Sequence, residues 1–305
     1  MKVLVCDPIA EKGIEMLKNA GFEVEVKTGM SKEELLKEIK TPDAIIVRSA
    51  TKVTKEVIES AENLKLIVRG GVGIDNIDVE AAKSKGIEVL NTPTASTVSV
   101  AELVMGMMLS LVRSLNVADR SMKQGRWEKK KFKGIELSGK TLGLIGAGRI
   151  ACAVAVRAKS FDMKVIAYDP YVFDEVFKKF EIERKDNLDD LLKEADIISI
   201  HTPLTEETKG LINRESIEKM KDGAILINCA RGGIVDENAL YEALKNGKLY
   251  GAGLDVYEKE PPEESPLFEL DNVILTPHIG AATKEAQLRV GIDSAQKIID
   301  FFSKK

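Results

Sequence analysis

Cysteine and histidine are scarce in this chain of 305 residues. It contains three cysteines, Cys6, Cys152 and Cys229, and two histidines, His201 and His278. Three widely separated cysteines match neither a disulfide framework nor a zinc site, so we expect reduced thiols that lie mostly in the core. With so few imidazoles and no paired cysteines, a transition-metal site is not expected either.

The chain also lacks a large net charge and a long hydrophobic run. Its net charge of −4 provides no field that would hold a polyanion, so nucleic acid is not an expected partner. The first apolar run meets Asp7 and Pro8 almost at once, which makes it too short for a signal peptide. The most apolar segment, 99–115, contains Glu102 and Arg113 and is too short to span a bilayer. We therefore expect a cytoplasmic protein without a membrane partner.

The sequence does contain enough apolar residues for two cores. Hydrophobic residues make up 44% of the chain and charged residues 31%, which is the composition of a globular protein. Short β-branched runs alternate with amphipathic helical stretches, a pattern typical of parallel sheets built from βαβ units. The first five predicted strands are 2–6, 22–27, 44–48, 64–69 and 88–91. Between them, Ser31 and Glu34 predict a capping box at the start of a helix, and Gly21 and Gly86 stand at expected helix ends.

The alternation stops after residue 93 and restarts near residue 141. The intervening segment predicts one long helix over about 96–125, apolar around much of its circumference, and we interpret part of the region 96–135 as a dimer interface. Six further strands are predicted at 141–145, 164–168, 197–201, 224–228, 251–255 and 273–276, the number in a complete dinucleotide-binding sheet. The last helical segment, 284–302, has no strand of its own. We therefore expect a discontinuous first domain, 1–95 plus 284–305, and a second domain over 96–283.

Residues 140–171 contain the most informative motif. A predicted strand ends in Gly146-Ala147-Gly148, and a helix begins near Arg149, which is the context required of a dinucleotide-binding loop. Gly146 permits the tight turn, and Gly148 lets the backbone approach a pyrophosphate at the start of the helix. The third glycine position holds Ala151, which the motif tolerates.

The acid that ends the next predicted strand, Asp169, indicates which dinucleotide binds. A carboxylate there accepts hydrogen bonds from both hydroxyls of the adenine ribose and repels a 2′-phosphate. Because Pro170 and Tyr171 follow, no neighbouring arginine is present to accommodate that phosphate. The motif therefore favours NAD over NADP.

Polar side chains follow three of the later strands. Arg231 follows the strand 224–228, Asp255 and Glu260 follow 251–255, and His278 follows 273–276. Ligands of such sheets bind at the carboxyl ends of the strands, so we expect the substrate there. Taken alone, a single histidine is more often structural than catalytic. The small residues after His278 nevertheless leave its ring accessible, and Arg231 has room to present a planar fork to a carboxylate.

These motifs and their order resemble those of the D-isomer-specific 2-hydroxyacid dehydrogenase family over nearly the whole chain. The matching segments are RSATKVT (48–54), RGGVGIDNID (69–78), NTPTAST (91–97), GRWEKKKFKGIELSGKTLGLIGAGRI (125–150), YDPY (168–171), HTPLTEETKGLIN (201–213), NCARGGIVDE (228–237), AGLDVYEKEP (252–261) and TPHIGAAT (276–283). The resemblance implies an α/β fold of two doubly wound parallel-sheet domains, a flavodoxin-like substrate domain and a Rossmann NAD-binding domain, with a cleft between them.

The resemblance also implies an NAD-dependent dehydrogenase with the catalytic set Arg231, Glu260 and His278. His278 would exchange the proton of the C2 hydroxyl, Glu260 would orient the imidazole, and Arg231 would hold the substrate carboxylate. Cofactor contacts are implied for Val72, Gly146, Gly148, Arg149, Ile150, Asp169, Thr202, Cys229, Ala230, Arg231, Asp255, His278 and Gly280. His201 belongs by resemblance to the cofactor side and not to proton transfer. Substrate contacts are expected from Arg48, Ser49, Arg69, Gly71, Val72, Gly73, Asn91, Arg231 and His278.

The substrate is a small 2-hydroxy acid, and the resemblance favours D-3-phosphoglycerate, the substrate of the first step of serine biosynthesis. Arg48 and Arg69 would supply positive charge to its phosphate. The lysine run 127–133 is either a solvated surface or a further source of charge across a homodimer. Glyoxylate and hydroxypyruvate reductases share the catalytic set and remain the alternative, and an NAD-sensing corepressor is a remote one. The chain resembles a short form of such enzymes, without a carboxyl-terminal effector-binding domain.

Overall fold

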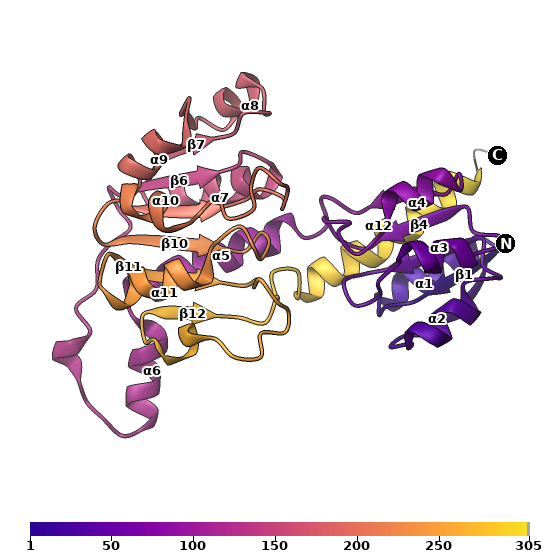
Figure 1. Cartoon of the computed structure of the whole chain (residues 1–305), viewed down its shortest axis with the longest axis horizontal. Coiled ribbons are helices and arrows are strands. Elements are labelled where there is room, and N and C mark those ends of the chain that lie inside the picture. Colours follow the sequence, from indigo (N-terminus) through magenta and orange to yellow (C-terminus); the bar gives the residue numbers. More distant parts are fainter. Residues whose placement is uncertain (304–305) are drawn as a thin grey trace. The chain divides into compact units, whose positions relative to one another are not determined.

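The computed structural model describes residues 1–303, which form two compact α/β units (Figure 1). Unit 1 contains Met1–Thr97 and the segment that begins at Ala281, and unit 2 is Val98–Gly280. The boundaries between the units thus fall at 97/98 and 280/281, whereas the sequence pattern predicts them at 95/96 and 283/284. Each unit is a doubly wound parallel sheet, which confirms the predicted fold class.

Unit 1 is built on a five-stranded sheet in the order β2-β1-β3-β4-β5. All neighbouring strands are parallel, and this order is the flavodoxin-like one. Its strands are β1 (Lys2–Val5), β2 (Glu23–Val26), β3 (Ala44–Val47), β4 (Leu66–Arg69) and β5 (Glu88–Asn91). Its helices are α1 (Glu11–Asn19), α2 (Lys32–Glu38), α3 (Lys55–Ser60), α4 (Val79–Ser84) and α12 (Lys284–Ser303).

Helices cover both faces of this sheet, as its buried central strands β1, β3 and β4 require. α1 and α12 pack on one face, where Leu17 and Ile298 join side chains of the strands in one apolar cluster. α2, α3 and α4 pack on the other face, where Leu35 and Ile58 belong to a second cluster. The last helix of the chain therefore completes the core of the first unit.

Local signals in the sequence set several helix ends of unit 1. Ser31 caps α2 and forms the predicted capping box with Glu34, so each side chain accepts a hydrogen bond from the other residue's backbone. Gly21 and Gly86 follow α1 and α4 with φ angles of +86° and +71°, which glycine adopts without strain. These predictions are confirmed.

Unit 2 is built on a seven-stranded parallel sheet in the order β12-β11-β10-β9-β6-β7-β8. The sequence predicts six of these strands and misses β8, because a two-residue edge strand is too short to show a pattern. The strands are β6 (Thr141–Ile145), β7 (Lys164–Tyr168), β8 (Glu183–Arg184), β9 (Ile197–Ile200), β10 (Ala224–Asn228), β11 (Leu249–Leu254) and β12 (Val273–Leu275). The strand order reverses between β6 and β9, which is where Rossmann sheets bind a dinucleotide.

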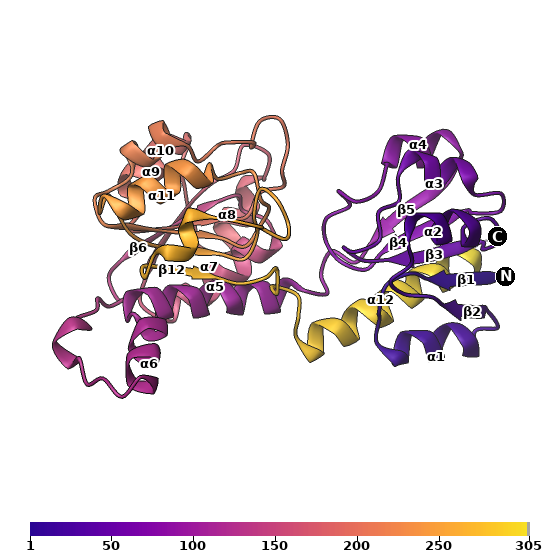
Figure 2. The same cartoon turned by 60° about the horizontal axis from the view of Figure 1, so that its bottom comes forward.

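The helices of unit 2 form a layer on each face of the sheet (Figure 2). One layer consists of α5 and α7 with α8 at its edge, and the other consists of α9, α10 and α11. The helices are α5 (Thr97–Val112), α6 (Leu115–Lys123), α7 (Arg149–Lys159), α8 (Asp174–Lys179), α9 (Leu188–Glu194), α10 (Arg214–Lys219) and α11 (Glu237–Lys245), with 3-10 turns η1 (Lys129–Lys131) and η2 (Pro266–Glu269).

The single long helix predicted over 96–125 is wrong, because the chain forms two helices there. α5 ends at Val112, and Ser114 takes a left-handed conformation with φ +49°, so α6 leaves at an angle of 65°. α5 buries most of its apolar side chains inside unit 2, and this explains much of the apolar circumference. In α6 the side chains of Leu115 and Met122 are half exposed.

Within residues 1–303, no single helix is long and apolar enough to cross a membrane, and only the bent pair α5 and α6 passes that test of length and composition together.

Candidate active site

His278 stands on a strained turn after β12. Its φ angle of +52° is left-handed, and its backbone N–H donates to the carbonyl of Thr276 at 3.0 Å. The carboxylate of Asp255, which is 1% exposed, accepts hydrogen bonds from the N–H groups of Ile279 and Gly280, both at 2.7 Å. It also accepts the hydroxyl of Thr276 at 2.6 Å. A buried acid after β11 therefore holds the turn that presents the imidazole.

Glu260 and His278 form an oriented pair. Oε2 of Glu260 lies 2.7 Å from Nδ1 of His278, and both side chains are partly exposed. The other carboxylate oxygen of Glu260 accepts the backbone N–H of Tyr257 at 3.2 Å. Since Nδ1 is engaged, Nε2 is the ring nitrogen that can exchange a proton with a substrate.

Arg231 lies on the loop after β10, directly beside the loop that carries Glu260. A Cβ on Gly232 would stand 1.7 Å from the carbonyl oxygen of Tyr257, so only glycine permits this approach of the two backbones. Asn228 braces the loop by donating to the carbonyl of Arg231 at 2.9 Å, and Nη1 of Arg231 donates to the carbonyl of Ala230 at 2.7 Å.

These three side chains gather at one edge of the unit 2 sheet. β10, β11 and β12 are neighbours and parallel, so the loops that follow them share the carboxyl-end edge. The structure thus brings Arg231, Glu260 and His278 to the same edge as the loop after β6. An acid–base group, its orienting carboxylate and a guanidinium are together suited to proton transfer on a carboxylate-bearing molecule.

The loop between β6 and α7 fits a pyrophosphate. Gly146 has a φ angle of +95°, and a Cβ there would stand 2.9 Å from the carbonyl oxygen of His201. Nothing lies within 4 Å of where a Cβ of Gly148 would be, so that face of the loop is open. Gly148 caps α7 without a side-chain hydrogen bond, which leaves the first amides of the helix to meet an anion. Nearby, the hydroxyl oxygen of Thr202 is buried without a hydrogen-bond partner.

Asp169 lies where a ribose would be held, but its carboxylate is already partly engaged. Oδ2 accepts the N–H of Ala147 at 2.8 Å, and Oδ1 accepts those of Tyr171 and Val172 at 2.9 and 3.1 Å. A carboxylate has about four acceptor positions, so one on Oδ2 is left for a ribose hydroxyl. Hydrogen bonds from both ribose hydroxyls to Asp169 would require one of these three backbone N–H groups to release the carboxylate.

The remaining residues expected to contact the cofactor divide between the units. Arg149 and Ile150 begin α7, and Cys229 and Ala230 follow β10, so both pairs lie at the carboxyl-end edge of unit 2. The carboxylate of Asp255 is bonded to the His278 turn, which assigns it a structural task in this state. Val72 belongs to unit 1.

His201, which is partly exposed, and the three buried cysteines are groups outside proton transfer. Nε2 of His201 lies 2.9 Å from the hydroxyl of Ser199, and desolvation lowers the pKa of this imidazole to about 3. Cys6, Cys152 and Cys229 are buried and form no disulfide, and burial raises the pKa of each thiol. The thiol of Cys229 packs against the sulfur of Met107 at 3.6 Å.

Unit 1 gathers the expected substrate residues at the carboxyl ends of its own strands. Arg48, Arg69 and Asn91 follow or end β3, β4 and β5. The guanidinium of Arg69 lies over Gly71, where a Cβ would stand 1.4 Å from Nη1. Nη1 of Arg48 donates to the side chain of Gln287 at 2.6 Å, and burial lowers the pKa of Arg48 from its ordinary value.

Two residues that the sequence reading missed hold the loop that carries Arg48 and Ser49. Asp7, buried at the end of β1, accepts the N–H groups of Arg48 and Thr51. Asn76 donates to the carbonyls of the same two residues at 2.7 and 2.6 Å. Asp7 could have been found by the signal that found Asp255, because both are acids directly after an apolar strand. The partners of Asn76 depend on tertiary structure.

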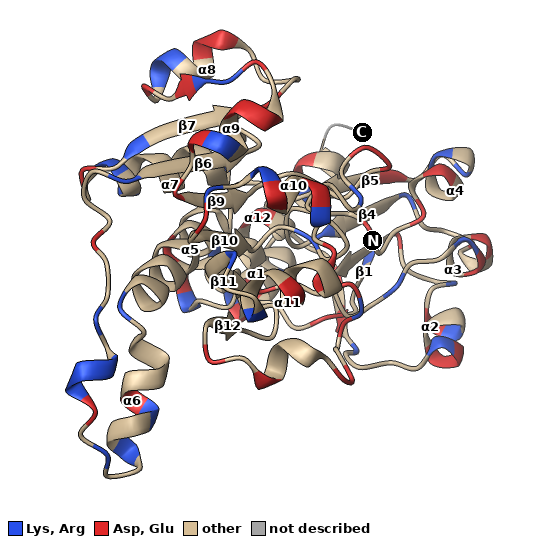
Figure 3. Ribbon diagram, turned by 60° about the vertical axis from the view of Figure 1, so that its left-hand side comes forward, with Lys and Arg blue, Asp and Glu red and all other residues tan. Residues whose placement is uncertain are grey.

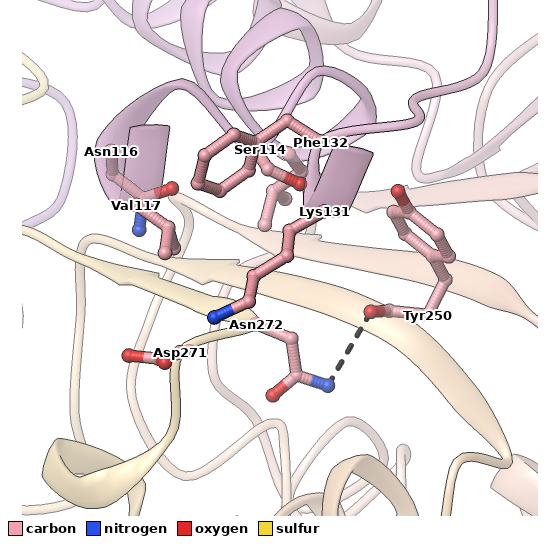
Figure 4. Close-up of a pocket in the computed structure, with 9 residues that line it drawn as sticks. Ser114, Asn116, Val117, Lys131, Phe132, Tyr250, Asp271 and Asn272 are labelled. Carbon is pink, nitrogen blue, oxygen red and sulfur yellow. Dashed lines mark hydrogen bonds between the residues drawn. The ribbon is translucent and has the colours of Figure 1, made fainter. Parts of the chain in front are cut away.

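A separate pocket of about 350 Å³ lies at the opposite edge of the unit 2 sheet (Figure 4). Tyr250 and Asn272 line it at the amino ends of β11 and β12, and Ser114, Lys131 and Phe132 line it from the α6 side. Asn272 donates to the carbonyl of Tyr250 at 3.4 Å. This pocket is remote from the strand ends that carry Arg231 and His278.

Comparison with known proteins shows which family this chain is similar to. Residues 105–280 match the family described as D-isomer specific 2-hydroxyacid dehydrogenase, NAD binding domain. The chain is similar to the D-3-phosphoglycerate dehydrogenase of Methanocaldococcus jannaschii, with 56% identity over 298 residues that cover 98% of this chain and 57% of that protein. It is also similar to the hydroxypyruvate reductase of Thermotoga maritima, with 55% identity and 97% of each chain covered. The chain spans little more than half the length of the curated phosphoglycerate dehydrogenases that it matches.

Among solved structures, the D-lactate dehydrogenase of Aquifex aeolicus complexed with NAD and lactic acid has a TM-score of 0.85. It is 35% identical in sequence, and the match covers 100% of this chain and 96% of that one. The similarity therefore extends over both units.

Proposed function

This chain belongs to the D-isomer specific 2-hydroxyacid dehydrogenase family, and we propose that it oxidises D-3-phosphoglycerate to 3-phosphohydroxypyruvate with NAD, the first step of serine biosynthesis. The observation that carries the proposal is the 2.7 Å contact between Glu260 and His278 at the sheet edge that also holds Arg231 and the β6–α7 loop. That edge combines an acid–base pair with a site that fits a dinucleotide.

The proposed roles of the three side chains follow from their geometry. Nε2 of His278 takes the proton of the C2 hydroxyl, and the carboxylate of Glu260 stabilises the imidazolium that results. Arg231 binds the substrate carboxylate and stabilises the oxygen on C2 as it becomes a carbonyl. Gly146, Gly148, the first amides of α7 and Asp169 would hold the dinucleotide. NAD, when bound, accepts the hydride from C2.

The positive groups of unit 1 support a phosphorylated substrate. Arg48 and Arg69 end adjacent strands, and a phosphate accepts hydrogen bonds from guanidinium groups in a bidentate manner. Ser49 is exposed on the same loop as Arg48, and the backbone of Gly71-Val72-Gly73 follows Arg69. We assign these groups, with Asn91, to the substrate.

A second candidate activity is the reduction of hydroxypyruvate. The named reductase from Thermotoga maritima matches along 97% of its own length at 55% identity, which nearly equals the 56% of the archaeal phosphoglycerate dehydrogenase. The identities therefore do not decide between the two substrates. A measurement of whether Arg48 binds the substrate phosphate decides between them.

The test is a comparison of NADH-linked reduction of 3-phosphohydroxypyruvate, hydroxypyruvate, glyoxylate and pyruvate, measured by absorbance. We expect the highest kcat/KM for the phosphorylated acid. Arg48→Ala should lower that value by roughly 10²-fold, as loss of a charge-assisted bond predicts, with a far smaller change for hydroxypyruvate. Equal losses for both acids would remove Arg48 from phosphate recognition and favour the reductase.

We further propose a homodimer formed through residues 96–135. α6 exposes Leu115 and Met122, and the segment after it exposes Trp127, whose side chain is 78% exposed. The 3-10 turn η1 consists of three lysines, and basic residues colour the ribbon blue in this stretch near α6 (Figure 3). An apolar surface of this kind on a projecting segment is typical of a subunit contact.

A further inference from the structure

Tyr257 touches all three loops that carry the proposed catalytic side chains. Its backbone N–H donates to Glu260 at 3.2 Å, and its backbone carbonyl is the group against which Gly232, next to Arg231, packs. Its phenol donates to the carbonyl of Thr276 at 2.9 Å, on the turn that presents His278. Tyr257 therefore connects loops that follow three different strands.

The phenol bonds the same carbonyl as the backbone of His278. The carbonyl oxygen of Thr276 accepts the N–H of His278 at 3.0 Å and the hydroxyl of Tyr257 at 2.9 Å. The carbonyl of Leu254 lies 3.4 Å from the phenol and is already bonded by the N–H of Thr276 at 3.0 Å. The phenol hydrogen is therefore committed to the carbonyl of Thr276, two residues before His278.

The surroundings of Tyr257 keep this bond in place. Its side chain is 7% exposed and belongs to the apolar cluster between the sheet and α9, α10 and α11. Burial, followed by the charges of Asp255 and Glu237, raises the pKa of Tyr257 to about 12. The phenol is therefore a protonated donor at every pH at which the enzyme would be assayed.

We infer that Tyr257 is a positioning residue for proton transfer, which sets the imidazole of His278 against the carboxylate of Glu260 by tying the His278 turn to the Glu260 loop. The inference rests on the proposed function, because it names a residue that acts through the proposed acid–base pair. Within the described part of unit 2, the hydrogen bonds of Tyr257 go to Glu260, Leu254 and Thr276 and not to the β6–α7 loop.

The physical consequence of losing the phenol is specific. In Tyr257→Phe the aromatic ring still fills its place in the core, and the carbonyl of Thr276 keeps its bond from the N–H of His278. The turn keeps its three hydrogen bonds to Asp255 but loses the bond from the phenol of Tyr257, the residue whose backbone N–H holds Glu260. Catalytic geometry is sensitive to such small displacements, whereas cofactor binding does not depend on this contact.

The kinetic test compares Tyr257→Phe with the wild type on whichever hydroxy acid the protein turns over. We expect kcat to fall by about three- to tenfold, the effect of one neutral hydrogen bond, with the Kd for NADH unchanged. Rates are divided by the number of NADH-binding sites found by fluorescence titration, so a loss of folded protein is not counted. Tyr241→Phe is the control, because that phenol bonds the exposed Lys245 on α11 and should leave kcat at the wild-type value.

A second readout needs no substrate and so separates this inference from the proposed activity. The chain has two histidines, so the ring resonances of ¹⁵N-labelled protein report His201 and His278 separately. We expect Tyr257→Phe to speed the solvent exchange of the Nδ1 proton of His278 and to leave the signals of His201 unchanged. Unaltered His278 signals together with an unaltered kcat would overturn the inference, even if the protein is an active dehydrogenase. A changed His278 signal in a protein without dehydrogenase activity would support the positioning and contradict the proposed function.

Discussion

His201 and His278 are the two imidazoles of the chain, and their surroundings differ as their proposed tasks require. His278 is an exposed residue on a left-handed turn, with Nδ1 bonded to a carboxylate. The backbone of His201 packs against Gly146 of the β6–α7 loop, and its imidazole is hydrogen-bonded to the hydroxyl of Ser199. Exposure with an orienting acid suits proton exchange, whereas desolvation without a charged partner holds an imidazole neutral.

The desolvated imidazole of His201 makes a testable contribution to acid sensitivity. Desolvation lowers the pKa of His201 from 6.5 to about 3, so between these values the unfolded chain binds a proton that the folded chain does not. The stability associated with neutral His201 is therefore complete above pH 6.5 and is lost progressively as the pH falls toward 3.

We expect His201→Gln to flatten the fall in the free energy of unfolding between pH 6.5 and about 4, whatever its effect at neutral pH. Urea denaturation at a series of pH values measures this slope. The same slope in the variant and the wild type would show that His201 is not held neutral by its site.

At this scale the sequence predicted the polar residues that directly follow strands and missed their supports. Arg231, Glu260 and His278 were expected near one another because ligand-binding groups collect at the carboxyl ends of parallel strands, and family resemblance implied their roles. Tyr257 was not predicted to support the site. Its partners lie on other loops, and the sequence around it is that of an ordinary core tyrosine. A periodic pattern contains no information about which carbonyl a phenol meets.

Among the elements, the contact of α1 with α12 shows how closely two helices pack when glycines meet. A Cβ on Gly13 of α1 would stand 2.4 Å from the backbone carbonyl oxygen of Gly291 in α12. The carbonyl oxygen of Gly291 and the Cα of Gly13 both belong to helix backbones and cannot move without moving a helix. The close approach therefore requires glycine at position 13. This contact joins the last helix of the chain to the first unit.

We expect Gly13→Ala to destabilise unit 1 by about 1–3 kcal/mol, the usual cost of overpacking a core. Gly106→Ala is the matched control, because Gly106 is an exposed helical glycine in α5 with nothing within 4 Å of its Cβ position. That change should stabilise the protein by about 0.5–1 kcal/mol. Thermal unfolding of the two variants measures both effects, and a neutral Gly13→Ala would mean that the helices separate at low cost.

Element boundaries were predictable where a local cause sets them. The capping box of α2 and the glycines after α1 and α4 depend only on neighbouring residues, and all were predicted. The end of α5 was not, because Ser114 adopts a conformation that serine rarely takes. β8 is an edge strand of two residues that exists through its pairing with β7, and no residue pattern of that length distinguishes a strand from a loop.

For the whole molecule, the discontinuous first unit follows from a visible break in the sequence. The βαβ alternation stops after β5, and the helical segment after β12 has no strand directly before it, so it was expected to cover the earlier sheet, as α12 does. The glycine loop and Asp169 indicated the cofactor, and family resemblance added the reaction. The sequence could not predict which apolar side chains of this region stay exposed. Those of α5 and α6 follow similar patterns, but α5 buries most of its apolar side chains inside unit 2.

The proposed dimer places its test on α6. Met122→Glu puts a charge on the exposed apolar surface, and we expect the dimer dissociation constant to rise by about tenfold or more through lost burial of that side chain. Phe173→Glu is the matched control, since Phe173 is 79% exposed at the N-cap of α8, away from residues 96–135. Sedimentation velocity over a concentration series gives both constants. A dimer that Phe173→Glu weakens and Met122→Glu does not would assign the interface to another surface.

The central claim is that His278, oriented by Glu260, exchanges the C2 proton while NAD takes the hydride. The direct measurement is the single-turnover rate of NADH formation from D-3-phosphoglycerate in the wild type and in His278→Asn, with NAD affinity measured in parallel. We expect the rate to fall by roughly 10²–10⁴, the usual contribution of a general acid–base group, with NAD affinity nearly intact. An undiminished rate in the variant, or no NADH from any 2-hydroxy acid in the wild type, would contradict the account.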